Sequence, residues 1–458
     1  MKVKAKIVIA VILVILVGFV GFELWGLAGR VKVPCSSICN IEVEVLVLPS
    51  EKQEFIDPET GAKIVRLTSD PSFDSFDYYE PSDWSPDDKK LKFVTSRFRD
   101  KFGDSVLHMI GTIDVETGEI IIYKTKYSIR WSEWSRDGRF IYGLALFEDK
   151  DFEPYFIAID TQENTGKVLR LQYKIDELPE GFDEKVGASK DPEETEWLIK
   201  GQYRIPERAQ FLHLNPSGTL AGFEMDDVFG VVDLENWKTW IVGIGRNRGA
   251  FFDDEHVAFG TLIPGGIVEK AVNVYTRREK TLDIANETFY TTIVCNHGNA
   301  FYENNQLAKI IVPGKHPTME GGYAFYIYDI RDNTIDILGQ TPEPNFGGPP
   351  ASISSDGRRV AGIGSDAVIF VYDVETKKKA TPFSGRFFDQ FTAPFGAVGT
   401  SYGGQLQISH DGQKVAFVSS LYESEEKLKD AIEREKRGGE EDPTDIFVIY
   451  LEDELFKE

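Results

Sequence analysis

From Ala62 onward, the chain repeats one pattern of apolar and polar positions. An apolar residue precedes a short polar turn that ends in Asp-Gly or a related pair, and alternating apolar residues follow. Asp-Gly between two such stretches is a strong hairpin signal, because Gly or Asn adopts the positive φ that a tight turn needs. Each copy therefore predicts two antiparallel strands. The five clear copies are 84–88 (WSPDD), 134–138 (WSRDG), 214–218 (LNPSG), 353–357 (ISSDG) and 408–412 (ISHDG).

Two further copies, 251–259 and 301–309, have a turn that is one residue shorter. Roughly 20 to 30 residues after most copies, a second apolar strand ends in Asp, as at 112–114 (TID) and 231–233 (VVD), and a polar turn and a short fourth strand follow. Four strands in about 50 residues is the period of a propeller blade. The pattern therefore predicts an all-β fold, a seven-bladed β-propeller over residues 62–452.

The two ends of this region predict how the ring closes. The last unit shows only three strands, at 405–409, 414–419 and 445–451. A propeller must hide its open edge and commonly pairs one terminus with the other. We therefore predict that strand 63–68 (KIVRLT) pairs with the last blade. Residues 421–443 are predicted to form a charged helical insertion within that blade.

An apolar run covers residues 7–22 and continues to Ala28, interrupted only by Glu23. About 20 apolar residues suffice to cross a membrane. Because Lys2, Lys4 and Lys6 precede the run, the positive-inside rule keeps them cytoplasmic. Residues 1–30 are thus predicted to be a cytoplasmic stub and a transmembrane helix, 31–61 a linker, and the propeller extracytoplasmic. A cleaved signal peptide is the alternative, because residues 26–28 (GLA) are small.

Charge and cysteine content narrow the function. The whole chain carries a net charge of −24, and residues 34–458 hold 46 basic and 74 acidic residues. Such a surface repels nucleic acid, so no nucleic-acid partner is expected. The three cysteines, at 35, 39 and 295, allow at most one internal disulfide. The fold cannot depend on a disulfide framework, and pairing of Cys35 with Cys39 or with a partner stays open.

The residues of the first unit resemble a known family. Segment 63–68, followed by 84–87 (WSPD) and 93–96 (FVTS), resembles the TolB-type, WD40-like propeller repeat. Residues 61–96 also resemble oligogalacturonate lyases, which are seven-bladed and metal-dependent, whereas TolB itself has six blades. TolB-like repeats serve binding proteins, peptidase accessory domains and lyases, so the resemblance implies a fold more than a function.

Long segments are predicted to gather on one face of the propeller. In a four-stranded antiparallel blade, the connection from second to third strand and the connection to the next blade emerge on the same face. The long segments fall almost entirely in these two classes: 70–83, 173–207, 311–322, 341–350, 383–405 and 421–443. Loops longer than about a dozen residues are usually functional or disordered. We place the functional site on this decorated face.

Two of these segments supply candidate ligand-binding residues. Segment 383–402 combines a basic group with aromatic rings that can stack on a sugar or grip a peptide, or else pack over the propeller mouth. The acidic segment entering the first blade offers carboxylates for Ca²⁺ or a cationic ligand, or else solvated loop charges. The candidates are Arg386, Phe387, Phe391, Tyr402, Asp74, Asp77 and Glu80.

Metal and catalytic candidates depend on the lyase resemblance. None of the six histidines has paired ligand spacing, which favours separate histidines in loops and strands. The resemblance implies a divalent metal held by histidines and a glutamine, with His297 and His316 as candidate ligands. Arg204, Arg208 and His297 are the candidate catalytic residues.

No catalytic constellation stands out, which favours a non-catalytic protein-binding or glycan-binding scaffold that requires no cofactor. The alternatives are a metal-dependent polyuronate lyase and a subunit of a cell-envelope assembly. The last is suggested by segment 421–443, which could dock a partner.

Overall fold

The chain divides into two compact units, Met1–Ile38 and Cys39–Glu458. The computed structural model describes residues 38–77, 82–98, 109–147, 153–182, 198–206, 209–225, 228–244, 250–263, 266–282, 300–315, 323–341, 351–363, 369–387, 390–394, 406–424, 426–427, 429–430 and 443–456. The predicted anchor, residues 1–30, lies outside these ranges. Within them, no helix has the length and apolar character needed to cross a bilayer.

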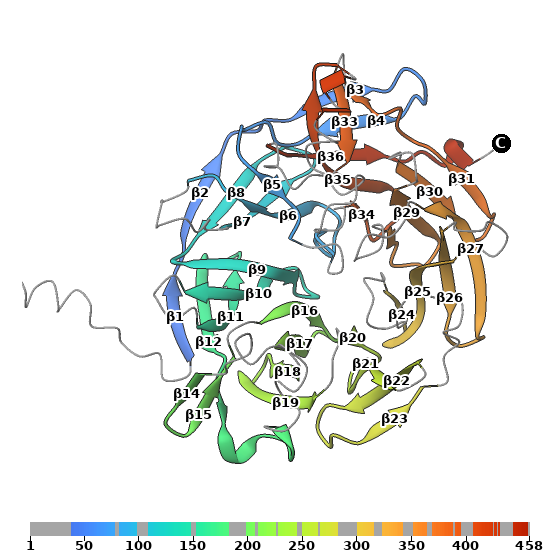
Figure 1. Cartoon of the computed structure of the whole chain (residues 1–458). Helices are drawn as coiled ribbons and strands as arrows, with labels where there is room; N and C mark the ends of the chain where they lie inside the picture. Colours follow the sequence, from blue (N-terminus) through green and yellow to red (C-terminus); the bar gives the residue numbers. More distant parts are fainter. Residues whose placement is uncertain are drawn as a thin grey trace, which may run out of the picture. The chain divides into compact units, whose positions relative to one another are not determined.

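The unit Cys39–Glu458 is an assembly of β-sheets placed side by side around a ring (Figure 1). Its described residues form seven sheets of four or more strands, here numbered I to VII along the chain, and one small three-stranded sheet. Consecutive strands within the seven sheets pair antiparallel. The predicted all-β architecture is therefore confirmed in the described part of the chain.

Sheets I and II each have five strands. Sheet I has the order β2 (Glu44–Leu48), β8 (Ile120–Lys124), β7 (Met109–Asp114), β6 (Lys90–Thr95) and β5 (Asp74–Ser75). Sheet II has the order β1 (Ile38–Glu42), β12 (Thr165–Arg170), β11 (Pro154–Asp160), β10 (Phe140–Phe147) and β9 (Tyr127–Trp134).

Sheets III to VI have four strands each, in chain order. Sheet III contains β16 (Gln210–Leu214), β17 (Leu220–Met225), β18 (Val228–Asp233) and β19 (Lys238–Ile244). Sheet IV contains β20 (Ala250–Phe251), β21 (His256–Ile263), β22 (Gly266–Asn273) and β23 (Glu279–Thr281). Sheet V contains β24 (Ala300–Glu303), β25 (Gln306–Lys315), β26 (Tyr323–Asp329) and β27 (Thr334–Thr341). Sheet VI contains β28 (Ala351–Ile353), β29 (Arg359–Ile363), β30 (Ile369–Asp373) and β31 (Lys378–Ala380).

Sheet VII joins strands from both ends of the unit. Its order is β3 (Gln53–Ile56), β4 (Lys63–Arg66), β36 (Asp445–Tyr450), β35 (Lys414–Tyr422), β33 (Gln390–Pro394) and β32 (Arg386–Phe387), and β34 (Leu406–Ile408) also pairs with β35. Strand β4 lies antiparallel to β36, with Val65 opposite Val448 and Ile64 opposite Ile449. The pairing of 63–68 with the last sheet, expected from the sequence, is therefore present.

The repeated turn motif has one hydrogen-bond pattern. Ser85 Oγ donates to the Asp87 carboxylate at 2.7 Å and accepts the Lys90 N–H at 2.9 Å. The turns that begin at Ser135, Ser354 and Ser409 repeat both bonds. Each serine and aspartate thus supplies partners for backbone groups that the tight turn leaves unpaired. This is why the motif recurs once per hairpin.

The hydrophobic core lies between the faces of neighbouring sheets. One cluster joins Phe93 and Ile122 of sheet I to Val65 and Val448 of sheet VII. Other clusters join sheets II and III, III and IV, IV and V, V and VI, and VI and VII. Since a sheet packed in this way is covered on both faces, polar side chains on its strands also become buried.

The predicted linker 31–61 is wrong for residues 38–56, which we call the N-terminal strap. Its strands β1, β2 and β3 extend three different sheets: β1 lies beside β12, β2 beside β8, and β3 beside β4. Strand β1 alternates exposed and half-buried positions, and β2 and β3 combine exposed and half-buried positions without a fully buried one. That alternation suits an edge strand with one covered face. The strap thus ties sheets VII, I and II together.

Gly166 of β12 makes room for the strap. A Cβ at this position would lie 2.6 Å from Ile41 Cγ1 and 3.0 Å from Val43 Cγ2. Gly166→Ala is therefore expected to displace Ile41 and lower the free energy of unfolding by about 1–2 kcal/mol. Urea denaturation and limited proteolysis of the strap measure this. In an Ile41→Ala background the same change should cost nothing further, and an unchanged Gly166→Ala protein would contradict the packing.

Two insertions differ from their predicted form. Segment 173–207, expected as a loop, contains the small sheet of β13 (Tyr173–Lys174), β15 (Tyr203–Ile205) and β14 (Leu198–Lys200), together with the 3₁₀ helix η1 (Ile175–Glu177). In the predicted helical insertion 421–443, Leu421 and Tyr422 still belong to β35, and the described residues 426, 427, 429 and 430 are helical. A second 3₁₀ helix, η2 (Asp453–Phe456), follows β36.

Candidate functional site

A cleft of about 600 Å³ lies where sheets VII and I meet, and we call it the junction cleft. Its described lining comes from β4 and the loop after it, from β33, from the end of β35, from Lys427 and Asp430, and from Pro443 and Asp445 at the start of β36. Asp70 comes from the acidic segment 70–83, Gln390 from the aromatic segment 383–405, and Lys427 from the insertion 421–443. The cleft thus brings together residues of three of the six long segments that the sequence singled out.

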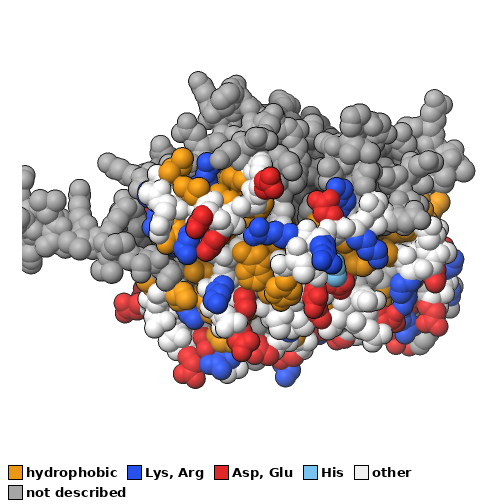
Figure 2. Space-filling model, turned by 90° about the horizontal axis from the view of Figure 1, so that it is seen from below, with side chains coloured by type: hydrophobic (Ala, Val, Ile, Leu, Met, Phe, Trp, Pro, Cys, Tyr) orange, Lys and Arg blue, Asp and Glu red, His pale blue; other side chains and the backbone are white. Residues whose placement is uncertain are grey.

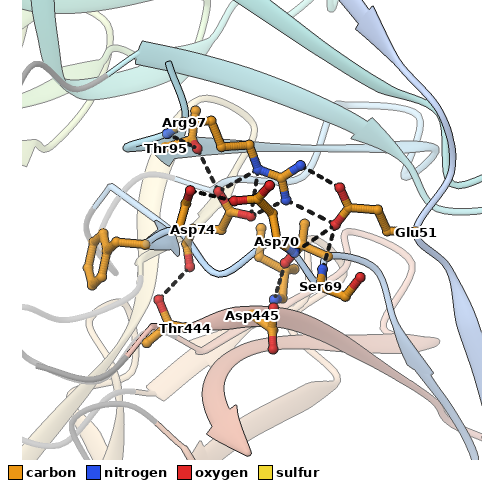
Figure 3. A network of polar contacts seen from close by, with 12 residues as sticks. Glu51, Ser69, Asp70, Asp74, Thr95, Arg97, Thr444 and Asp445 are labelled. Atoms are coloured by element: carbon orange, nitrogen blue, oxygen red, sulfur yellow. Dashed lines mark hydrogen bonds and ion pairs between the residues drawn. The ribbon is translucent and has the colours of Figure 1, made fainter. Parts of the chain in front are cut away.

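A buried network of charges lies behind the cleft (Figure 3). Arg97, which follows β6, bonds the carboxylate of Asp74 through Nε and Nη2, and the Thr95 hydroxyl donates to Asp74 at 2.6 Å. Arg97 Nη1 also lies 2.6 Å from Glu51 of the N-terminal strap. Glu51 in turn accepts the backbone N–H groups of Ser69 and Asp70 at 2.5 and 3.1 Å. The strap therefore fixes the loop that forms one wall of the cleft.

Asp445, at the start of β36, connects the cleft with this network. Both Nε and Nη2 of Arg66 bond its Oδ2, at 3.1 and 2.7 Å. Burial raises the pKa of Asp445 to about 7, and the nearby charges of Asp74 and Glu51 act in the same direction, against Arg66. For Asp74, burial likewise raises the pKa, although Arg97 opposes it. Carboxylates are therefore crowded at this junction.

A second charged pair lies nearby on sheet I. The Asp83 and Lys92 side chains are both fully buried and form an ion pair. Burial raises the pKa of Asp83 to about 7, against the effect of Lys92. Asp83 Oδ2 and Ser132 Oγ are buried without a hydrogen-bond partner. Asp83, Lys92 and Ser132 belong to the interior of the fold, and none of them lines the junction cleft.

The structure places the predicted ligand-binding residues in different surroundings. Asp74 is fully buried against Arg97, so it is not a solvated loop charge, and Asp77 accepts the Ser132 N–H at 2.5 Å. Phe387 is buried in the core against Phe55 and Phe447, which removes its ring from a ligand and favours the packing alternative.

Four further candidates complete the set. Arg386 is exposed on β32, and Phe391 lies on β33 opposite Tyr422 of the cleft in the β-ladder. Glu80 and Tyr402 lie outside the described residues.

Of the candidates taken from the lyase resemblance, the structure describes only Arg204, which does not line the cleft. Arg204 lies on β15 of the small sheet, with its guanidinium 5.5 Å from the centre of the Phe182 ring. Arg208, His297 and His316 lie outside the described residues. Among the residues that the structure describes, no group of three or more His, Cys, Asp or Glu side chains could hold a metal ion.

Sequence reasoning missed Glu51, Arg66, Arg97 and Asp445. Each is a single charged residue at the end of a strand or in the supposed linker, and nothing in its neighbourhood marks it as buried. A signal existed for the strap, because residues 41–48 (IEVEVLVL) alternate as a β-strand does. A strand predicted over residues 41–48 would have placed Glu51, three residues later, next to a sheet.

The outer surface on the side shown in Figure 2 carries acidic and basic side chains mixed with groups of hydrophobic ones. Exposed large hydrophobic residues of the described chain include Ile175, Ile199 and Tyr275. Tyr275 stacks on Trp240 with ring centres 5.9 Å apart. This mixture is that of an ordinary protein surface.

Comparison with known proteins supports the fold. No protein-family model and no curated protein matches the sequence. An oligogalacturonate lyase in complex with manganese has 12% identity and a TM-score of 0.57 over 91% of this chain and 100% of its own. The lyase from Vibrio parahaemolyticus has 12% identity and a TM-score of 0.57 over 90% and 100%. The β-propeller domain of the Pyrococcus furiosus trilobed protease has 11% identity and a TM-score of 0.44 over 76% and 91%.

The similarities to the two lyases establish the fold alone, because the identities are low. The chain has a β-propeller fold similar to that of the oligogalacturonate lyases. The resemblance that the repeat motifs indicated is therefore confirmed.

Proposed function

We propose that this chain is a seven-bladed propeller that binds a protein or glycan partner in the junction cleft without changing it chemically. Residues 1–30 anchor it in a membrane, and the propeller lies outside the cytoplasm. A metal or other cofactor is not needed for this role. The observation that carries the proposal is the meeting of three long segments in one cleft, since long loops held on a rigid scaffold commonly form binding sites.

Binding to arrays of oligosaccharides and short peptides tests the proposal with the full chain in detergent. Gln390→Ala and Tyr422→Ala each remove a side chain from the cleft lining. Each variant is expected to bind the array members that the parent chain binds about tenfold more weakly, which corresponds to about 1.4 kcal/mol of binding free energy. Glu375→Ala, an exposed change near β31, is the matched control. Equal signals from all four proteins would exclude the cleft as the site.

A second function, polyuronate lyase activity, is supported by the two lyases, whose full lengths align with about nine-tenths of this chain. Incubation with oligogalacturonate and Mn²⁺, followed by ultraviolet absorbance of the unsaturated product, separates the two functions. We expect no turnover. Metal-dependent product formation would replace the binding proposal with the enzymatic one.

A further inference from the structure

Among the described residues, the two basic side chains that line the junction cleft each pair with a carboxylate of the protein. Arg66 gives two hydrogen bonds to Asp445, and Lys427 forms an ion pair with Glu423, four residues earlier. Each cation is thus partly neutralised by its partner, so these two groups attract an anion less than two unpaired cations would.

The acidic groups of the cleft keep unused acceptor capacity. Asp430 is exposed, and no basic side chain pairs with it among the described residues. The Asp70 carboxylate accepts one hydrogen bond, from the Ser72 hydroxyl. The Asp445 side chain is only 9% exposed, and the described residues give it hydrogen bonds at Oδ2 alone. Within the described part of the chain, no donor bonds Asp445 Oδ1, and Asp445 lines the cleft.

The buried charges behind the cleft increase the excess of carboxylates over basic groups. Counted over the described residues, the cleft and the groups Glu51, Asp74 and Arg97 behind it hold five carboxylates and three basic groups. Burial and the neighbouring carboxylates hold the pKa of Asp445 well above its ordinary value. A positive charge placed in the cleft would relieve that repulsion. Tyr422, which also lines the cleft, presents an aromatic ring of the kind that attracts cations.

We infer that the junction cleft selects a cationic group, the ammonium or guanidinium of a basic partner, and disfavours anionic glycans. This inference rests on the binding function proposed above and names the chemistry of its ligand. Lysine and arginine side chains of a partner protein and free polyamines share this chemistry. Polyuronates carry the opposite charge, so the cleft is not a polyuronate subsite.

Fluorescence anisotropy with the full chain in detergent tests the inference. The probes are a labelled tetralysine peptide, its fully acetylated form, labelled spermidine and a labelled oligogalacturonate. We expect tetralysine to bind and acetylated tetralysine not to bind. Spermidine tells the two sources apart: binding that matches tetralysine identifies a general amine site, and weaker binding identifies a peptide site, both consistent with a cationic ligand.

Two variants locate the binding. Asp430→Asn changes an exposed carboxylate and leaves the buried network intact, and Asp445→Asn keeps the shape of the side chain. Each is expected to weaken tetralysine binding by about five- to tenfold, more at low salt than at high salt. Glu375→Gln, an exposed carboxylate of sheet VI, should leave it unchanged.

Proton linkage gives an independent readout. Asp445 takes up a proton as the pH falls through about 7, so tetralysine binding should weaken between about pH 8 and pH 6. The charged groups around it are Arg66, Asp70, Asp74 and Glu51, with Lys427 and Asp430 across the cleft. In Asp445→Asn the pH dependence should shrink.

The outcomes separate this inference from the proposed function. Binding of oligogalacturonate or a neutral array sugar that Tyr422→Ala abolishes would overturn the cationic ligand and keep the binding role. Tetralysine affinity that is the same in Asp430→Asn, Asp445→Asn and Glu375→Gln would overturn the cleft as the cationic site. Absence of any binding that is weakened by a change at Gln390, Tyr422, Asp430 or Asp445 would overturn both.

Discussion

Lys92→Met is expected to lower the free energy of unfolding by about 3–5 kcal/mol near neutral pH. The change removes the cation that faces Asp83, and both side chains of the pair are fully buried. The methionine fills similar volume, so the loss comes mainly from a carboxylate left without its partner. Urea denaturation of the full chain, followed by circular dichroism, gives the difference.

The effect should depend on pH in a defined direction. The folded pKa of Asp83 is about 7, far above its ordinary value of 3.8. A carboxyl group whose pKa is raised in this way stabilises the fold below its ordinary pKa, and that stabilisation is lost as the pH rises through about 7. Without Lys92 the ionised form is still less favourable. The gap between variant and parent should therefore widen from about pH 5 to about pH 8.

Lys89→Met is the matched control, because Lys89 belongs to the same hairpin and its side chain is 71% exposed. Its pair with Asp87, at 3.7 Å, is a surface ion pair worth well under about 1 kcal/mol. Replacing Asp83 by Asn together with Lys92→Met should recover most of the loss. Equal effects of the two lysine changes would show that Asp83 is not held as a buried charge.

The sequence predicts the repeated hairpins well because their chemistry is local. Each Ser and Asp of the turn motif bonds backbone groups within five residues, as in the turn from Ser85 to Lys90. The strand-ending aspartates are equally local: Asp114 accepts the N–H groups of Glu116 and Thr117 at 3.0 and 2.8 Å. Patterns of this kind are visible in a short window of residues.

Buried charges escaped prediction because burial in this fold is not local. Residues 90–93 (KLKF) alternate polar and apolar positions, which normally indicates a strand with one face in water. In the ring, neighbouring sheets cover both faces of a strand. Lys92 is consequently fully buried although it occupies the polar position of that alternation.

The same reason limits prediction of the candidate site. The three segments of the cleft could be selected by their length and chemistry, but their meeting depends on how β4 and β36 bring the chain ends together. The Arg66–Asp445 pair joins residues that are 379 positions apart. No spacing rule within one segment reveals such a contact. Once the closing pair of strands is known, however, Arg66 and Asp445 must lie at its neighbouring ends.

Val65→Pro should remove more stability than any single change in the cleft. Val65 is fully buried in the middle of β4, opposite Val448 of β36 and Glu54 of β3. Proline cannot donate to the β-ladder and is confined to edge strands, strand starts and bulges. We expect a loss of at least about 3 kcal/mol. Faster hydrogen exchange in residues 445–450 should accompany it, because sheet VII loses its bond to the start of the unit.

Gln53→Pro separates this effect from a general sensitivity to proline, because Gln53 is the first residue of the edge strand β3. It should cost under about 1 kcal/mol and leave exchange in β36 unchanged. A parent-like Val65→Pro protein would mean that β4 does not close the ring. The cleft would then lose its basis as well, since Arg66, Ser69 and Asp70 reach it only because β4 lies beside β36.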